Sequence, residues 1–246
     1  MAQDVFREDS RVGTLADIVV NLGPSGRGHQ DHVTAVVELR ISGLAGYLSH
    51  SDLMRVAQRV CVRSGVDLVY SQGFNPHPRL SMPLPKSVGL VSDGDIVVLR
   101  VQRTGSPDQA QAVADALRSQ WPEGIELQRV FLLDSGYTLY PYQADFEMTL
   151  PDQAVLEAAH AEAEQFMSQT HLIIERNNWK KKYKTKQLDI RSYITAIMKT
   201  HGGIVVTCQI RDDGAIRVDE MLGVLGLAPE NLGGPIQRKR LHWRLN

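Results

Sequence analysis

The pattern of apolar and polar positions in the first half of the chain predicts strands and helices in the order β-α-β-β-α-β. The predicted strands cover residues 33–42, 66–71, 94–103 and 124–133. The predicted helices cover residues 49–65 and 106–121. Ser49 and Ser106 stand at N-cap positions and Gly65 follows the first helix, which supports both assignments. This order of elements is that of a ferredoxin-like unit.

The second half repeats this order of elements without a repeat of the residues themselves. Its predicted strands cover residues 142–150, 171–176, 203–211 and 237–245, and its helices cover residues 151–169 and 217–227. Residues 188–200 are predicted to form a short helix or turn. We therefore expect an α+β fold with two tandem ferredoxin-like (βαββαβ) units built on antiparallel sheets. The expected divisions are a flexible N-terminal arm at 1–31, a first unit at 32–135 and a second unit at 136–246.

The motif "SQGFNPHPR" (71–79) lies between the second and third predicted strands. It contains a glycine and two prolines, which have strong backbone preferences. Glycine reaches backbone conformations that are closed to other residues, and each proline favours an extended residue before it. We expect a stiff, extended excursion that presents Gln72, Asn75, His77 and Arg79 to a ligand. The residues with an expected structural role here and at the helix start are Ser49, Asp52, Gly73, Phe74, Pro76 and Pro78.

Basic residues are segregated along a chain whose formal net charge is only −1. Arg55, Arg59 and Arg63 recur every four positions and form one ridge on the first helix. A second cluster interleaves lysines with aromatic rings and contains Trp179, Lys180, Lys181, Lys182, Tyr183, Lys184, Lys186 and Arg191. A third cluster contains Arg238, Lys239 and Arg240. Cations mixed with aromatic rings favour a surface that binds RNA, although a solvated face or a docking surface for an acidic protein remains open.

Other candidates for chemistry are few. His50 and His77 are weak candidates for an acid–base pair, and the alternative for each is a capping or loop histidine. Asp189 and Arg191 stand two apart, and we interpret them as a structural pair. The two cysteines, Cys61 and Cys208, are far apart in the sequence, which disfavours a disulfide framework, a zinc site and an iron–sulfur cluster. No cofactor, metal, membrane or DNA is expected, and the expected location is the cytoplasm.

Several motifs resemble those of the radical-SAM-linked protein family, an uncharacterised bacterial family. The resemblance rests on "SHSDLMR", "YSQGFNPHPRLSM" and "GLVSDGD", and more weakly on "DIRSYI" and "QRKRL". It implies a partner, because members are fused to or encoded beside radical SAM proteins, often ones with a cobalamin-binding domain. It also implies a setting in translation or RNA maturation, because the genes lie near those of ribosomal proteins and of a ribonuclease of the E/G type. This chain has no C-x-x-x-C-x-x-C motif, so any radical chemistry requires a separate polypeptide.

These observations lead to three functional hypotheses. The first is a non-catalytic accessory protein that binds tRNA or rRNA for a separate radical SAM partner. The second is a metal-independent endoribonuclease with the architecture of the CRISPR-associated RAMP proteins, in which His50 and His77 act on a 2′-hydroxyl. The third is a protein-docking scaffold that does not bind RNA.

Overall fold

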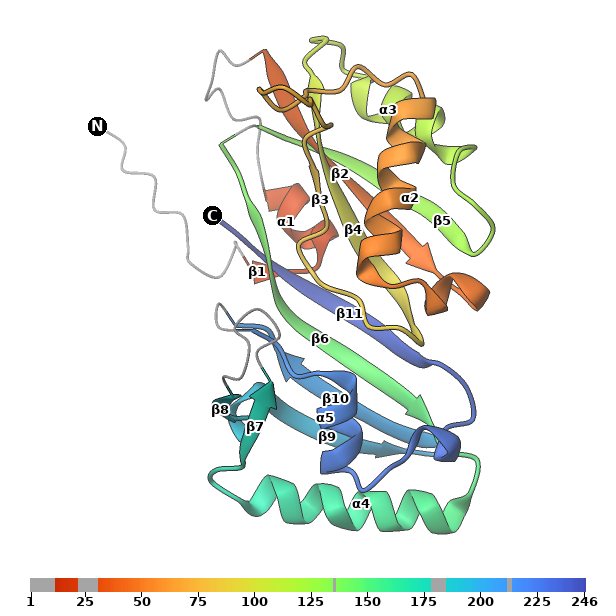
Figure 1. Ribbon diagram of the computed structural model, residues 1–246, viewed down its shortest axis with the longest axis vertical. Coiled ribbons are helices and arrows are strands. Elements are labelled where there is room, and N and C mark those ends of the chain that lie inside the picture. The colour runs from red at the N-terminus through yellow and green to blue at the C-terminus, as the bar shows by residue number, and fades with distance from the viewer. Residues whose placement is uncertain (1–11, 22–30, 135, 178–184, 212–213) are drawn as a thin grey trace, which may run out of the picture. The chain divides into compact units, whose positions relative to one another are not determined.

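The computed structural model describes residues 12–21, 31–134, 136–177, 185–211 and 214–246 (Figure 1). The chain has an α+β fold with mostly antiparallel strands, and it divides into two compact units. Unit 1 contains Met1–Tyr142 and Arg238–Asn246, and unit 2 contains Gln143–Gln237. Two strands, β6 (Leu139–Thr149) and β11 (Ile236–Leu245), carry the chain from one unit into the other. No helix in the described ranges is long and apolar enough to cross a membrane.

Unit 1 is built on a sheet whose hydrogen-bonded order is β5-β2-β4-β11. Short β3 pairs with β4, and short β1 pairs with β11. The strands are β1 (Val12–Gly13), β2 (His32–Ile41), β3 (Leu80–Ser81), β4 (Leu90–Gln102) and β5 (Ile125–Asp134). The helices are α1 (Leu15–Asn21), a 3-10 helix (Gly43–Tyr47), α2 (His50–Arg63) and α3 (Gln109–Arg118).

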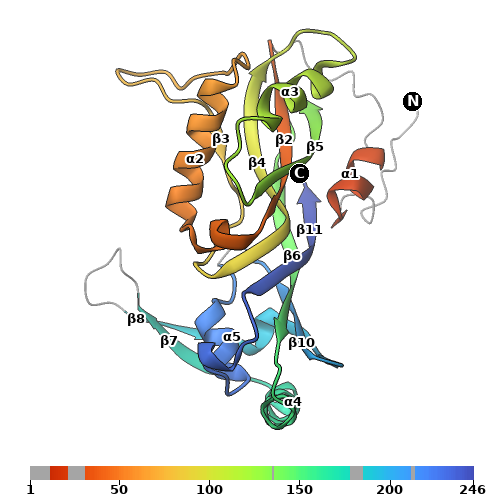
Figure 2. The ribbon, with the colours of Figure 1, turned by 90° about the vertical axis from the view of Figure 1, so that its right-hand side faces the viewer.

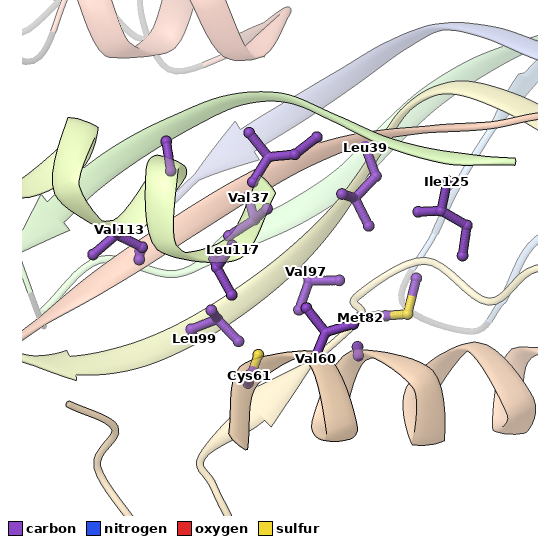
Figure 3. Packing of buried hydrophobic residues seen from close by; sticks show 14 of the residues in the cluster. Val37, Leu39, Val60, Cys61, Met82, Val97, Leu99, Val113, Leu117 and Ile125 are labelled. Carbon is purple, nitrogen blue, oxygen red and sulfur yellow. The ribbon is translucent and has the colours of Figure 1, made fainter. Parts of the chain in front are cut away.

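The core of unit 1 lies between the sheet and helices α2 and α3. Alternate residues of β2 and β4 point toward these helices, and the apolar face of α2, formed by Leu53, Ala57, Val60 and Cys61, is buried against them. Figure 3 shows Val60 and Cys61 of α2 facing Val97 and Leu99 of β4. Burial of each such side chain contributes about 1.5–3 kcal/mol. The opposite face of β2 and β4 carries a pocket, which is the candidate site.

Two parts of unit 1 differ from the sequence-based expectation. The strand expected at residues 66–71 is reduced to isolated bridges at Leu68 and Tyr70, because the chain leaves the sheet at this point. The expected flexible arm contains an ordered piece, since residues 12–21 form β1 and α1. Leu15 and Ile18 of α1 are buried, which gives this piece a hydrophobic reason to pack.

Unit 2 is built on the strand order β6-β10-β9, with a separate hairpin of β7 and β8 (Figure 1). Its strands after β6 are β7 (Ile173–Asn177), β8 (Thr185–Asp189), β9 (Ile194–Thr200) and β10 (Gly203–Gln209). Its helices are α4 (Gln153–Ser168), α5 (Val218–Val224) and two 3-10 helices, Arg191–Tyr193 and Pro229–Asn231. Of the helix or turn expected at residues 188–200, the structure contains only the 3-10 helix. Residues 188–189 end β8, and residues 194–200 form β9, which pairs with β10 with one register shift at Thr207/Cys208.

The C-terminal strand also differs from the expectation. The sequence places residues 237–245 in the second half, but from Arg238 onward β11 belongs to unit 1. There it is hydrogen-bonded beside β4 and pairs with β1, where Trp243 lies opposite Gly13. This placement brings Arg238, near the start of β11, to Asp95 of the "GLVSDGD" motif.

Candidate functional site

The motif at residues 69–79 forms a hairpin that leaves the edge of β4 and returns to it. The chain leaves at Val69, whose N–H donates to the carbonyl oxygen of Arg100 at 2.8 Å. It returns at Arg79, whose carbonyl oxygen accepts from the N–H of Arg100 at 3.0 Å. The N–H of Arg79 donates to Val69, and that of Ser71 donates to His77, both at 2.8 Å. The excursion expected from the sequence is therefore a hydrogen-bonded hairpin.

This hairpin, which lies between α2 and β3, projects away from the rest of unit 1 (Figure 2), and its tip presents an aromatic ring to solvent. Gly73 has φ +142°, so the prediction that it adopts a conformation closed to other residues is confirmed. The next residue, Phe74, is fully exposed at 103% and packs on nothing, although the sequence suggested a structural role for it. Gln72, Asn75, Pro76 and His77 are exposed as well.

A row of side chains crosses unit 1 on the face of the sheet away from α2 and α3. Leu133 of β5 lies opposite Thr34 of β2, and Thr34 lies opposite Arg100 of β4. Leu80, the first residue of β3, pairs with Leu99, and the same register places the preceding residue, Arg79, opposite Arg100. Directly opposed residues of an antiparallel pair share a face, with Cβ atoms about 5 Å apart. The hairpin motif and β4 thus place two guanidinium groups side by side.

This row forms one wall of a pocket of about 560 Å³. The second row is Val36, Val98 and Ser81, and the rim is formed by Tyr137–Pro141. Thr34, Ser81, Tyr137, Thr138 and Tyr140 contribute hydroxyl groups to the lining. Arg79 and Arg100 are the charged groups among the described lining residues, which include no carboxylate. The pocket therefore combines apolar walls with excess positive charge.

The two guanidinium groups have different surroundings. Nη1 of Arg100 lies 3.1 Å from Nε2 of His32. A guanidinium can only donate, so His32 accepts through Nε2 in its neutral form. Within the described part of the chain, the guanidinium of Arg79 forms no hydrogen bond or ion pair. Like charges directly opposite each other destabilise a sheet, and nothing in the lining compensates for this pair.

One family model matches this chain. The family described as "Uncharacterized protein conserved in bacteria (DUF2344)" matches residues 36–219. The chain belongs to this family. The matched range includes the whole hairpin of residues 69–79 and the strand β4 that carries Arg100. No curated protein matches the chain.

The arginine ridge of α2 is exposed, and its members differ in what they contact. The helix begins as predicted, because the Oγ of Ser49 accepts from the N–H of Asp52. Asp52 also binds Arg55, with Oδ1 2.9 Å from Nη1. Arg63 donates to the carbonyl oxygen of Gln120 at 2.9 Å. The guanidinium of Arg59 has no hydrogen bond or ion pair within the described ranges, so it is available to a ligand.

Arg238, which the sequence grouped with a basic surface cluster, lies inside unit 1. Its side chain is only 3% exposed and binds Asp95, which is 2% exposed. Nη2 lies 2.6 and 2.7 Å from the two carboxylate oxygens, and Nη1 donates to the carbonyl oxygen of Pro85 at 2.9 Å. Arg238 is therefore unavailable at the surface. Of its neighbours, Lys239 is half-buried and Arg240 is exposed.

A buried lysine lies near this ion pair. The Nζ of Lys86 donates to the carbonyl oxygens of Gly46, Leu48 and Ser87 and thereby holds the loop before β4 against the 3-10 helix. Burial lowers the pKa of Lys86 to about 8, and Asp95 opposes that shift. Locally, the sequence shows no sign of this anchor apart from a lysine that follows Pro85.

The two candidate histidines lie far apart. His50 begins α2 and lies close enough to Asp95 and Arg238 for their charges to affect its pKa. His77 belongs to the hairpin, which branches from β4 at Arg100. The stretch of β4 from Asp95 to Arg100 spans about 17 Å, at about 3.3 Å per residue. An acid–base pair must reach the same phosphodiester, and this arrangement does not bring the two imidazoles together.

We expect His50 to make the protein less stable in mild acid. Burial lowers its pKa below 6.5, and its Nδ1 is buried without a partner in the described part of the chain. As the pH falls below 6.5, the unfolded chain binds a proton at His50 before the folded chain does, so the free energy of unfolding decreases. His50→Gln should weaken this decrease between about pH 7 and about pH 5 in urea unfolding, whereas His77→Gln should not. Parallel curves for His50→Gln and the wild type would contradict this expectation.

The basic cluster of unit 2 is only partly described. Residues 179–184, with Trp179, Tyr183 and four of the lysines, lie outside the described residues. Lys186 of β8 is exposed. Arg191 has a structural role, because its guanidinium donates to the carbonyl oxygens of Met167, Gln169 and Ile194 and lies over the ring of Phe166.

The carboxylate of Asp189 accepts a hydrogen bond from the backbone N–H of Arg191, rather than forming an ion pair with its guanidinium. The carboxylate of Asp189 accepts from the N–H groups of Leu172 and Arg191 and binds Nδ1 of His171 at 2.7 Å. These hydrogen bonds lower the pKa of Asp189, and the bond to His171 has the largest effect. The structural interpretation thus holds for both residues, with partners that the sequence did not indicate. Among the described residues, no group of three or more His, Cys, Asp or Glu side chains is placed to hold a metal ion.

Sequence reasoning missed the pocket. Arg100 stands in an otherwise apolar strand segment, "VVLRVQ", and this interruption was the available signal. Its relation to Arg79 depends on strand register, which local patterns do not fix. The hydroxyl groups of the lining likewise come from three separate segments of the chain.

Proposed function

We propose that the chain is a non-catalytic RNA-binding accessory protein that serves a separate radical SAM protein in tRNA or rRNA maturation or in translation. The contact edge in this proposal is the hairpin of residues 69–79 together with the basic ridge of α2. The observation that carries the proposal is the full exposure of Phe74 at the tip of a hydrogen-bonded hairpin.

This edge offers the two groups that proteins use to bind single-stranded RNA. An aromatic ring can stack on an unpaired base, and guanidinium groups bind the phosphates. Phe74 supplies the ring, and the exposed, unpaired Arg59 supplies a cation on the same unit. The hydrogen bonds of the hairpin stem hold the tip before a ligand arrives, which reduces the entropy lost on binding.

The radical SAM part of the proposal rests on the resemblance of the motifs and on the cysteines. Both cysteines are buried. Burial raises the pKa of Cys61 to about 12 and also raises the pKa of Cys208. Since the thiolate is the form that binds metals, neither side chain is suited to hold a cluster. The partner would therefore supply the iron–sulfur cluster.

We also propose that both units are ferredoxin-like. For unit 1, support comes from the strand order β5-β2-β4, from the bridged segments 68–81 beside β4 and from the two core helices. This is the arrangement of a βαββαβ unit whose second strand is interrupted by the hairpin. For unit 2 the support is the order of its elements alone.

An exposed Phe74 also suits a protein-docking hot spot, which makes a docking scaffold the second candidate. The unpaired cations favour RNA, because the centre of a protein interface is depleted of charge. The endoribonuclease alternative is less favoured, since it requires His50 and His77 to act on one phosphodiester.

The proposal predicts that Phe74→Ala weakens the binding of single-stranded RNA. Loss of one stacked base should raise the dissociation constant about tenfold or more, as measured by fluorescence anisotropy with a labelled oligonucleotide. Tyr47→Ala is the matched control, because Tyr47 is an aromatic residue of the same unit that is 60% exposed. Arg59→Glu should also weaken RNA binding, and it should make the affinity for RNA less dependent on salt concentration.

Equal RNA affinity in the wild type and in Phe74→Ala would contradict the proposal. Co-purification of a protein that survives nuclease treatment and is lost in Phe74→Ala, without RNA affinity, would identify the edge as a docking surface instead.

A further inference from the structure

The pocket on the face of the sheet away from α2 and α3 has a chemistry of its own. Its described lining contains two guanidinium groups, five hydroxyl groups and no carboxylate. Basic residues on protein surfaces are usually balanced by acidic neighbours, as Arg40 is by Asp93. Arg79 and Arg100 lack such a neighbour in the lining, so the pocket favours an anion.

The placement of the two arginines adds to this argument. They lie directly opposite each other across the β3–β4 ladder, where like charges repel. The contact of Arg100 with His32 holds one guanidinium, while Arg79 has no partner in the described ranges. An anion between them would remove the repulsion and satisfy both groups. A local conflict of this kind is typical of functional sites.

We propose that this pocket binds the phosphomonoester group of a nucleotide, with the phosphate between Arg79 and Arg100. A phosphomonoester carries a charge of about −1.5 to −2 at neutral pH, which matches two guanidinium groups better than a single carboxylate does. Each guanidinium can bind phosphate oxygens through two parallel hydrogen bonds. The hydroxyl groups of Thr34 and Ser81 flank the arginines and supply further donors.

The size and walls of the pocket fit the rest of a nucleotide. Its volume of about 560 Å³ lies within the range of small-molecule sites. Val98, Leu133 and Pro83 form apolar walls for a base, and Tyr140, which is 40% exposed, stands at the rim where a ring can stack. Tyr137 and Thr138 place hydroxyl groups where they can bind a ribose.

This inference goes beyond RNA binding at the hairpin tip and stands without it. The phosphomonoester has two sources, a free mononucleotide and the phosphorylated end of an RNA strand, and the pocket recognises the chemistry that they share. The two sites also have separate variants, since Phe74 belongs to the tip and is absent from the pocket lining.

Isothermal titration calorimetry of the full chain tests the inference. The probes are AMP, UMP, adenosine, and a short RNA with either a 5′-phosphate or a 5′-hydroxyl. We expect AMP to bind and adenosine to bind at least about tenfold more weakly, because the phosphate carries the charge-assisted hydrogen bonds. Arg79→Gln should raise the dissociation constant of AMP about tenfold or more, and Arg100→Gln should do the same.

Arg40→Gln is the control, since Arg40 is a surface arginine of β2 that lies outside both the pocket lining and the proposed RNA-binding edge. Arg79→Gln removes no described partner of the guanidinium and relieves its repulsion with Arg100, so its thermal stability should be at least that of the wild type, and this measurement separates lost binding from misfolding. Tighter binding of the 5′-phosphorylated RNA than of AMP supports the strand end as the source, and equal binding supports the free nucleotide.

Three results would overturn the inference. They are equal affinity for adenosine and AMP, unchanged affinity for AMP in both arginine variants, and absence of binding of either phosphorylated probe. Loss of RNA binding in Phe74→Ala with unchanged binding of AMP would leave both proposals standing. Normal binding of AMP with no effect of Phe74→Ala on RNA would retain the pocket and remove the RNA contact at the tip.

Discussion

Asp95→Asn should lower the free energy of unfolding of unit 1 by about 3–5 kcal/mol, because it leaves the charge of Arg238 buried without a counter-charge. The two side chains are 2% and 3% exposed, and Nη2 of Arg238 lies 2.6 and 2.7 Å from the carboxylate oxygens. Asp95 also accepts from the Oγ of Ser92 at 3.0 Å. The substitution keeps the shape of the side chain and removes its charge, so the loss would come from electrostatics rather than from packing.

Urea unfolding, with hydrogen exchange of the β4 amides to follow unit 1, measures this effect. Asp93→Asn is the matched control two positions away, because Asp93 pairs with Arg40 at the surface and that pair is about half exposed. The control should cost at most about 1 kcal/mol. The double variant Asp95→Leu/Arg238→Met should regain most of the lost stability, since apolar residues of similar volume often replace a buried ion pair without loss. Equal losses in Asp95→Asn and Asp93→Asn would contradict the burial of the pair.

Gly203→Ala should lower the free energy of unfolding of unit 2 by about 3 kcal/mol, at the upper end of the usual cost of overpacking. Gly203 begins β10 and lies opposite Thr149 of β6. A Cβ at this position would overlap the carbonyl oxygen of Met148 and lie 3.1 Å from the Cα of Thr149. Because these are backbone atoms, the strands would have to move apart, and the pairing of β6 with β10 would be weakened.

Gly202→Ala is the control for that change. A Cβ on Gly202 meets no atom within 4 Å, so the same substitution one residue earlier should change the stability by no more than about 0.5 kcal/mol. Hydrogen exchange of the β10 amides should report the difference directly. Similar stabilities for the two variants would show that β10 does not approach β6 in this way.

Much of the local structure could be predicted from the sequence. The start of α2 followed from Ser49 and Asp52. The spacing of Leu53, Ala57, Val60 and Cys61 is that of the face which the helix buries. The backbone of Gly73 followed from its place between polar and proline residues. These features depend on interactions between residues a few positions apart, which the sequence displays directly.

The functional surfaces were harder to predict. In the sequence, Arg238 resembled its neighbours Lys239 and Arg240. In the structure it is buried in an ion pair with Asp95, which is 143 positions away. The pocket escaped prediction because Arg79 and Arg100 meet only through the register of β3 on β4. In both cases a side chain's environment depends on a strand that is distant in sequence.

The sequence by itself determined the α+β class, the main helices, most of the strands, and the backbone of Gly73, whose φ of +142° is rarely open to other residues. The tertiary structure decided which charges are buried, which are paired and which are left facing a pocket. The physical reason is the range of the interactions. Helix caps and turns form between near neighbours in the chain, whereas burial and electrostatic pairing depend on strand pairing across more than a hundred residues.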